Sequence, residues 1–272
     1  MTLSSRRFVL PASRDREDIM SDLNEQATDD KAAARDATYW AKAVSRLNVS
    51  EVPAGAAGIN VSGKRLAGPI QGFGKMWQKT YQVAVPGSLV SPTDLVATWK
   101  QRFSEFWPAG NHFYAPLTGI EPGEVALIGM SLPGKMTLST GVMVLYADEE
   151  SFTLMTPQGH MFAGWITLSA TTRGTDTVAQ AQVLMRASDP VFEVALTLGG
   201  HRQEDKFWQA TMTSLAETMG ATGASVDTQV VCVDKRRQWS RWTNVWHSSA
   251  IRSTIYTMTT PFRPRRPRVP KA

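Results

Sequence analysis

Apolar runs separated by turn residues fill the middle of the chain. The run at 79–85, KTYQVAV, alternates polar and apolar positions, which is typical of a strand with one buried face. More such runs follow at short spacing, and they are EVALIGM at 124–130, STGVMVLYA at 139–147, ESFTLMT at 150–156, HMFAGWITLSAT at 160–171 and DTVAQAQVLMRA at 176–187. Short connections favour antiparallel neighbours, because a parallel pair needs a crossover of about a dozen residues or more. The pattern predicts an antiparallel meander.

A helix is predicted between the first strand and the meander. Ser91 can cap its first turn, with Pro92 at the first helical position and Asp94 placed for a near capping box. The apolar residues Leu95, Trp99, Phe103 and Phe106 then recur at helical spacing. Pro108 ends the run, so one helix of about four turns is expected.

The segments around these elements carry weaker signals. Residues 38–47, TYWAKAVSRL, are compatible with a short helix, and a glycine-rich irregular connection is expected from there to Lys75. The stretch 111–114 is expected to be irregular. We therefore place an N-terminal extension at 36–78 and begin the main domain at residue 79.

Two helices and a strand are predicted after the meander. Asp189 and Pro190 open a short helix over 191–198, which Gly199 and Gly200 are expected to close. A longer helix over 201–219 follows, and its apolar stripe is Trp208, Met212, Leu215 and Met219. The strand at 225–234 is expected to complete a domain over 79–234.

The C-terminal stretch RRQWSRWTNVWHSSAI forms an amphipathic pattern. On a helix, Trp239, Trp242 and Trp246 share one face and arginines project from another. A basic helix with tryptophans is typical of interfacial membrane anchors, and aromatics among cations also suit unpaired bases. We favour a third interpretation, in which 235–260 docks on the domain through the tryptophans, because a helical apolar stripe more often packs than stays exposed.

Charge is distributed unevenly along the chain. The net charge is +5, yet residues 235–272 hold ten basic residues and no acid, which leaves 19 basic and 24 acidic side chains before them. We expect the end of the chain, 261–272, to be disordered and open to anionic surfaces. Its cations are Arg263, Arg265, Arg266, Arg268 and Lys271. The polar residues 1–35 are expected to form a disordered lead, with Met20 as a plausible alternative start.

The single cysteine, Cys232, excludes an internal disulfide framework and fits a reducing compartment. Because it lies in the apolar run VVCV, we expect a buried thiol and not a nucleophile. No apolar run approaches the roughly 20 residues of a transmembrane helix. We expect a soluble, cytoplasmic protein without a transmembrane segment.

The order of elements resembles the helix-grip fold. The phrases TPQGHMFAGWITLSA, ASDP and GGHRQEDKFW are similar to an uncharacterised bacterial branch of the START-like superfamily, also called Bet v 1-like or SRPBCC. The resemblance implies an α+β fold in which a curved antiparallel sheet wraps a long C-terminal helix, here with N- and C-terminal extensions. It also implies an interior pocket for a lipid, sterol or polyketide-like molecule.

Several chemistries are excluded by their motifs. IGMSLPG has proline where a nucleophile elbow needs glycine, and GPIQGFGKM has the wrong spacing and no hydroxyl residue for a phosphate loop. The four histidines lack the spacing and the partners of a zinc site, so neither a metal nor another cofactor is expected.

The pocket would be lined by methionine, aromatic and a few polar side chains. The expected ligand-binding residues are Tyr114, Met130, Met143, Met155, His160, Phe162, Trp165, Met185, Phe192, Trp208 and Met212. For any one of the apolar residues, simple core packing is an equal alternative, and His160 also suits a turn position bonded to backbone.

Two classes of function stay open at this point. A carrier or sensor needs only a lined cavity with one or two orienting polar groups. A cyclase, dehydratase or hydrolase also needs a positioned acid or base, for which His160, Tyr114 and Glu193 are the candidates. We favour the binding protein.

Overall fold

The computed structural model describes residues 37–49, 52–132 and 136–259. The chain divides into two units, Met1–Tyr39 and Trp40–Ala272, and the fold and the site lie in the second. The expected lead at 1–35, the alternative start at Met20 and the basic stretch at 261–272 fall outside the described residues.

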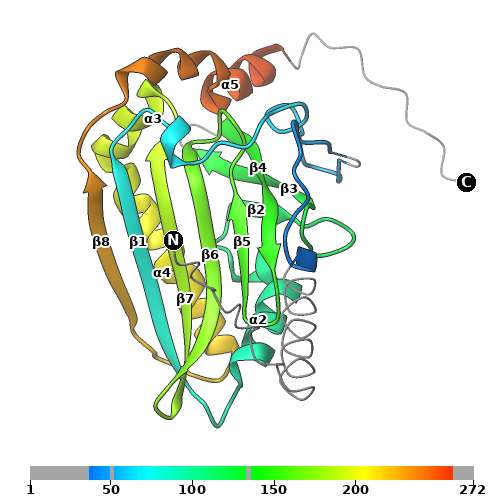
Figure 1. The fold of residues 1–272 in the computed structure, drawn as a ribbon, viewed down its shortest axis with the longest axis vertical. Helices are drawn as coiled ribbons and strands as arrows, with labels where there is room; N and C mark the ends of the chain where they lie inside the picture. Colours follow the sequence, from blue (N-terminus) through cyan, green and yellow to red (C-terminus); the bar gives the residue numbers. More distant parts are fainter. Residues whose placement is uncertain (1–36, 50–51, 133–135, 260–272) are drawn as a thin grey trace, which may run out of the picture. The chain divides into compact units, whose positions relative to one another are not determined.

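Eight strands form one antiparallel sheet in the order β2-β3-β4-β5-β6-β7-β1-β8 (Figure 1). Their bounds are β1 Met76–Pro86, β2 Asn111–Tyr114, β3 Val125–Leu132, β4 Met136–Ala147, β5 Ser151–Met155, β6 Phe162–Arg173, β7 Asp176–Ala187 and β8 Val226–Asp234. The predicted meander is confirmed. The first and last strands pair with each other, so β1 lies between β7 and the edge strand β8.

The stretch 111–114, expected to be irregular, is the strand β2. It pairs with β3 in a register that sets Phe113 opposite Ile128. Phe113 is buried, and its ring meets the ring of Phe103 edge-on at 4.8 Å. Four residues are too few for alternation to identify a strand, so tertiary packing decided this element.

The helix after β1 is shorter than predicted. Ser91 caps α2 (Pro92–Gln101), and its Oγ accepts the Asp94 N–H at 3.2 Å, as the capping pattern indicated. The helix ends at Gln101 and a separate 3-10 turn, η2 (Phe103–Phe106), follows. This break lets Phe103 pack edge-on against three aromatic rings of the core.

The two helices after the meander are joined and not separated. Asp189 caps α3 (Pro190–Ala195), and its Oδ1 accepts the Phe192 N–H at 3.0 Å. A wide π-type turn, η4 (Leu196–Gly200), then leads directly into α4 (His201–Thr218). Gly199 has a φ of 126° in this turn, a conformation that favours glycine, so the glycine pair bends the helix and does not end it.

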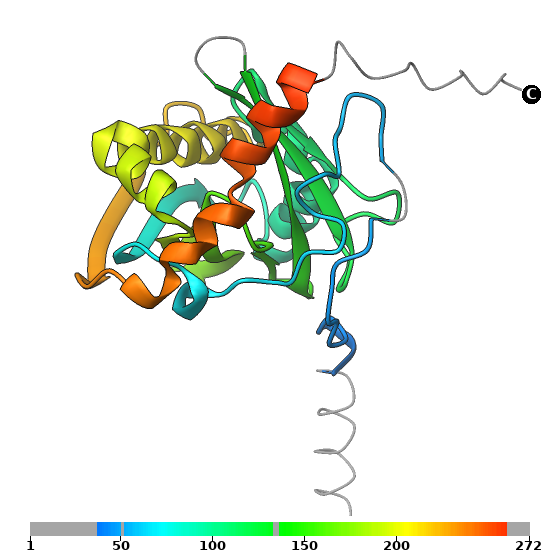
Figure 2. The same ribbon diagram turned by 90° about the horizontal axis from the view of Figure 1, so that it is seen from above.

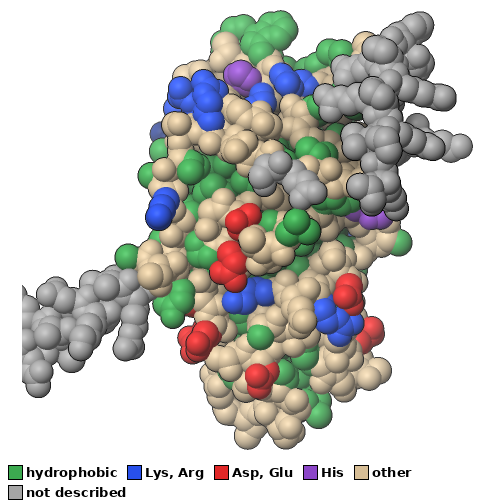
Figure 3. Space-filling model, turned by 90° about the vertical axis from the view of Figure 1, so that its right-hand side faces the viewer, with side chains coloured by type: hydrophobic (Ala, Val, Ile, Leu, Met, Phe, Trp, Pro, Cys, Tyr) green, Lys and Arg blue, Asp and Glu red, His purple; other side chains and the backbone are tan. Residues whose placement is uncertain are grey.

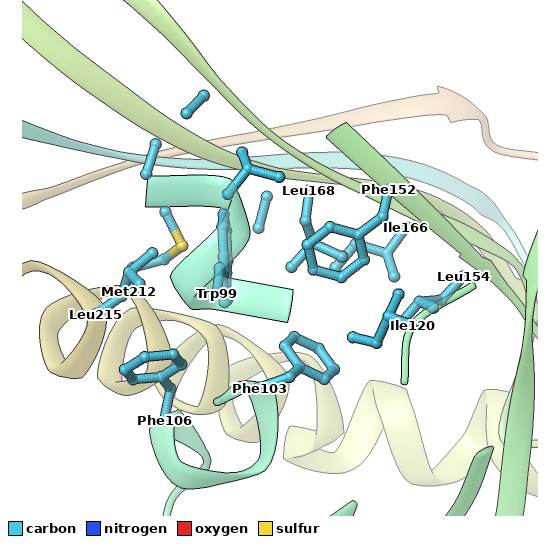
Figure 4. Packing of buried hydrophobic residues seen from close by; sticks show 14 of the residues in the cluster. Trp99, Phe103, Phe106, Ile120, Phe152, Leu154, Ile166, Leu168, Met212 and Leu215 are labelled. Atoms are coloured by element: carbon cyan, nitrogen blue, oxygen red, sulfur yellow. The ribbon is translucent and has the colours of Figure 1, made fainter. Parts of the chain in front are cut away.

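The core lies between the sheet and the helices α2 and α4, with Trp99, Phe103 and Phe152 at its centre (Figure 4). Met212 and Leu215 of α4 belong to the same core. Seen from above, the sheet curves around this helical layer (Figure 2). The chain therefore has the helix-grip α+β fold that the sequence predicted.

The helix predicted at 38–47 is wrong in its described part after Trp40. The backbone there bonds to other segments, because the Ala41 N–H donates to Leu145 O at 2.9 Å and the Leu47 N–H donates to Lys64 O at 2.7 Å. These tertiary partners occupy groups that a helix would have paired locally.

The edge strand β8 leaves much of its surface open. Val230, Val231 and Val233 are exposed, and Cys232 is half-buried. The expectation of a buried thiol is therefore wrong. The apolar run VVCV belongs to an edge strand, where only one neighbouring strand pairs with it and its valines stay exposed among the described residues.

The tryptophan segment also differs from its prediction. It forms a 3-10 helix, η5 (Trp239–His247), followed by α5 (Ser249–Thr259). Trp239, Trp242 and Trp246 are each more than half exposed, so the expectation that they bury is wrong. The segment docks mainly through backbone and polar groups, and the Trp239 ring meets the ring of Phe73 edge-on at 5.3 Å.

Candidate functional site: an apolar cavity beside the long helix

A cavity of about 870 Å³ lies between the concave side of the sheet and α4. The sheet supplies side chains at every second position, as in β6, where Phe162 and Ile166 flank the backbone of Gly164. Val183 and Met185 of β7 continue the same wall. The wall is almost entirely apolar because both layers turn their core-facing sides toward it.

Aromatic rings form the side of the cavity next to α4. The rings of Trp107 and Phe207 meet at 5.0 Å, and those of Phe207 and Trp208 meet at 5.2 Å, both nearly perpendicular. Ser131 of β3 and Lys206 of α4 also border the cavity and are exposed. The cavity therefore reaches solvent between β3 and the first turns of α4.

His160 is the buried histidine of the cavity wall. Its Nδ1 lies 3.0 Å from Phe162 N and 3.2 Å from Phe162 O, so it accepts from the N–H in one tautomer and donates to the carbonyl in the other. Burial lowers the pKa of His160 to about 4, although the hydrogen bond to the Phe162 backbone acts in the opposite direction. The residue serves both as the turn histidine and as the cavity residue that the sequence offered as alternatives.

A buried charge cluster joins α4 to β1 at the cavity. Lys79 is 1% exposed, and its Nζ lies 2.9 Å from Glu204 and 2.7 Å from Asp205. Tyr81 donates its hydroxyl proton to Asp205 at 2.7 Å. Burial, together with the two carboxylates, raises the pKa of Tyr81. Glu204 also lines the cavity, so this ion pair brings a carboxylate to the wall.

Sequence reasoning missed this cluster although a signal was present. In the run KTYQVAV, Lys79 shares its strand face with Tyr81, Val83 and Val85, all of which are buried. A lysine in register with buried positions needs an acidic partner, since an unpaired buried charge is very costly. Glu204 and Asp205, in the first turn of α4, are those partners.

The structure brings seven of the eleven expected ligand-binding residues to the cavity. They are Met130, His160, Phe162, Trp165, Met185, Phe192 and Trp208. Trp165 alternates with Gly164 and Ile166, and its ring packs beside Gly68 on the opposite side of the sheet. It therefore contributes mainly backbone to the wall.

The other four lie elsewhere. Tyr114 and Met143 belong to a second apolar cluster with Val61, and Tyr114 donates its hydroxyl proton to Gly55 O at 3.1 Å. Met155 also lies next to Gly68, and Met212 is fully buried in the main core. These four are packing residues, the alternative that the sequence left open for each apolar side chain.

Glu193 lies outside the cavity as well. Its Oε1 is 2.8 Å from Nε of Arg237, and its side chain is almost fully buried. The carboxylate therefore holds the segment after β8 against α3.

Within the described ranges, no cluster of three His, Cys, Asp or Glu side chains could hold a metal ion. In the same residues, no helix is both long and apolar enough to cross a bilayer.

Comparisons with known proteins gave the following. No family model matches the chain, and no curated protein matches it. Among solved structures, one similar structure is the di-domain ARO/CYC protein StfQ of the steffimycin biosynthetic pathway. The match spans 54% of this chain and 51% of the StfQ chain, with 9% identity and a TM-score of 0.42.

Two other similar structures cover nearly the whole of their own chains. Ara h 8.0201 covers 54% of this chain and 99% of its own, at 12% identity and a TM-score of 0.40. Protein Ms6760 from Mycobacterium smegmatis covers 53% and 91%, at 13% identity and a TM-score of 0.39. At such scores these likenesses assign no ligand to this chain, and the helix-grip fold stands on its own sheet and helices.

Proposed function

We propose that this protein binds an apolar small molecule, such as a lipid, sterol or polyketide-like compound, in the cavity beside α4, as a carrier or sensor. The supporting observation is the cavity itself. Its volume of about 870 Å³ falls within the roughly 300 to 1,000 Å³ typical of ligand sites, and its wall is mostly apolar. Met130, Met185 and Trp208 give that wall a deformable, polarisable surface that suits bulky hydrocarbon ligands.

Two polar features would orient the ligand. His160 lines the cavity, and a neutral imidazole has one donor and one acceptor nitrogen to offer to a polar group of the ligand. Glu204, held by Lys79, can accept a hydrogen bond at another point of the wall. A ligand with one or two polar groups on an otherwise apolar frame fits this arrangement.

The arrangement favours binding over turnover. Of the three candidate acids and bases, Tyr114 and Glu193 lie away from the cavity. His160 remains, but a pKa of about 4 makes it a weak base at neutral pH. A cyclase or hydrolase would then depend on Glu204, whose charge is already compensated by Lys79.

Native mass spectrometry of the purified full chain tests the proposal, because a carrier is expected to retain an apolar molecule. The companion measurement is calorimetric titration with a fatty acid, a sterol and a polycyclic aromatic probe. Met130→Trp fills part of the cavity and should weaken binding of the best probe by at least about tenfold, the loss expected from excluding a few buried methylene groups.

Leu89→Trp is the matched control, because Leu89 is exposed and not part of the cavity wall. It should bind the probe as the parent does. Absence of any bound molecule, together with no probe binding at micromolar concentration, would show that the protein is not an apolar-ligand carrier. A molecule converted during incubation, with conversion lost in His160→Ala, would favour the enzyme alternative.

A further inference from the structure

Helix α5 packs against the domain with its polar face inward. Ser249 and Ser253 are buried, and Ser253 Oγ accepts a hydrogen bond from Asn60 Nδ2 at 3.0 Å. Ile251 and Ile255, four residues apart on another face of the helix, are exposed. The amphipathic helix is therefore inverted relative to ordinary domain packing, in which the large apolar residues point inward.

The 3-10 helix η5 shows the same inversion. Asn244 faces the domain and donates from Nδ2 to Gln71 O and to Ser188 O, each at 2.8 Å. Trp239, Trp242 and Trp246 are 71%, 54% and 74% exposed. Polar contacts fix the segment together with the Trp239 ring, which meets Phe73 edge-on at 5.3 Å, while most of the Trp242 and Trp246 indole surface stays exposed.

The exposed apolar side chains gather at one end of the molecule. Both η5 and α5 run across this end (Figures 1 and 2), and η1 (Pro69–Gln71) lies against η5 through the contact of Asn244 with Gln71. We call this end the C-terminal face. Its large exposed apolar residues are Ile70, Trp239, Trp242, Trp246, Ile251, Ile255 and Met258. A patch of this composition marks an interaction site, because soluble proteins seldom expose so many large apolar residues together.

The segments that build the C-terminal face carry several cations, of which Arg236 pairs with Asp234 and Arg237 with Glu193. Neither 52–75 nor 235–259 contains an aspartate or glutamate. Burial and the positive charge of Arg252 lower the pKa of Lys64, and burial with both of these cations lowers the pKa of His247, so the three groups lie close together. Figure 3 shows basic side chains and a histidine near the end of the molecule where α5 lies, with acidic side chains farther from it.

We propose that the C-terminal face docks on the surface of an anionic lipid bilayer. Tryptophan partitions to the headgroup level, isoleucine and methionine reach the acyl boundary, and the cations approach lipid phosphates. The sequence after Thr259 adds Arg263, Arg265, Arg266, Arg268 and Lys271, which extend the same attraction. This surface lies on the outside of the molecule and does not depend on a ligand in the cavity.

Two other occupants fit the chemistry less well. Unpaired bases would stack on indoles, but the aliphatic Ile251, Ile255 and Met258 would gain nothing from stacking. A second copy of the chain would bring two predominantly cationic surfaces together, and like charges oppose such an interface. A bilayer with anionic headgroups satisfies both the apolar and the cationic residues.

Vesicle flotation of the full chain tests the proposal. The probes are vesicles of phosphatidylcholine alone and vesicles in which phosphatidylglycerol replaces part of that lipid. We expect binding to the anionic vesicles only, weakening as salt is raised. The double variant Trp242→Ser/Trp246→Ser should bind them at least about tenfold more weakly, since each indole withdrawn from the interface loses buried apolar area. Its melting temperature should equal that of the parent, because both indoles are exposed.

Leu117→Ser is the matched control, because Leu117 is 93% exposed and lies in the connection between β2 and β3, outside the C-terminal face. It should bind as the parent does. Ile251→Ser/Ile255→Ser provides a second test should the tryptophan variant fold poorly.

Three results would overturn the proposal. The first is equal binding of the parent to neutral and anionic vesicles, or none to either. The second is parental vesicle binding in both double variants. The third is a parent that binds no vesicles but binds single-stranded RNA or self-associates, with that activity lost in the double variants. This result would assign the face to a nucleic acid or to a second copy of the chain.

Discussion

The buried histidine of the cavity wall should make stability depend on pH in a defined direction. In the unfolded chain His160 takes up a proton near its ordinary pKa of 6.5, whereas in the folded protein its pKa is lowered to about 4. Between these values the unfolded state binds more protons, so the free energy of unfolding falls as the pH falls. Above pH 6.5 the ring is neutral in both states and the effect vanishes.

The size of the effect follows from the shift. Linkage over the interval from pH 7 to pH 5 gives a loss of about 2 kcal/mol from this one group. For a folded unit of this size, that corresponds to roughly 4 to 8 °C in melting temperature. Because carboxylates and other histidines also titrate over this interval, the informative quantity is the difference between the parent and a variant without the ring.

Urea unfolding of the parent and of His160→Gln at pH 7 and pH 5 measures that difference. The variant should be less stable at pH 7, because it loses the packing of the ring, but it should lose about 2 kcal/mol less than the parent on acidification. His112→Gln is the control, since His112 is exposed, and its pH response should match that of the parent. Equal losses in the parent and in His160→Gln would refute the burial argument.

Three further predictions concern charge and anchoring. Lys79→Met leaves Glu204 and Asp205 without their cation and should lower the free energy of unfolding by about 3 to 5 kcal/mol. Adding Glu204→Gln should restore part of that loss. Denaturant titration measures both, and a single variant as stable as the parent would contradict the prediction. Asn244→Ala removes two hydrogen bonds that anchor η5 to the domain. Limited proteolysis should then cut faster within η5 and α5, while the rest of the domain stays resistant. Cleavage at the parental rate would contradict this anchoring role. A chain ended after Thr260 should melt within about a degree of the parent, since the last few residues of most domains contribute little to stability. It should bind anionic vesicles more weakly without losing binding, because it lacks five cations; a large drop in melting temperature would show that the removed residues pack.

The sequence predicted the architecture better than the positions of individual side chains. Alternation and turn residues located β4 to β7, and the caps Ser91 and Asp189 act as expected. These signals are local, because a turn or a cap is determined by a few neighbouring residues. Which side chains of a strand face the cavity depends on packing by distant segments. For these side chains some predictions were right and others were wrong.

Strand β4 shows why some predicted cavity residues lie elsewhere. Its neighbours Val142, Met143 and Val144 are all buried, because the core covers one face and residues of the N-terminal extension cover the other. A strand covered on both faces has no polar positions to indicate its direction, so Met143 looked as suitable for the cavity as Met130. Only the packing of the extension separates the two.

The prediction for the C-terminal segment was wrong for a different reason. Its periodicity correctly marked an amphipathic element, but periodicity does not say which face turns inward. The polar anchors Asn244 and Ser253 find partners far away in sequence, namely Gln71, Ser188 and Asn60. Those contacts could not be inferred from the segment alone.

The position of β1 in the sheet has a consequence for the order of folding. β1 (Met76–Pro86) pairs with β7 (Asp176–Ala187) on one side and with β8 (Val226–Asp234) on the other, so both partners lie far downstream. During synthesis the first strand to leave the ribosome must wait with both edges unpaired while the meander assembles. Closing such long loops makes sheet completion slow, and it cannot finish before residue 234 has emerged. Nascent chains that stop between β7 and β8 would carry an open edge on β1, and an unpaired strand edge can pair with another chain.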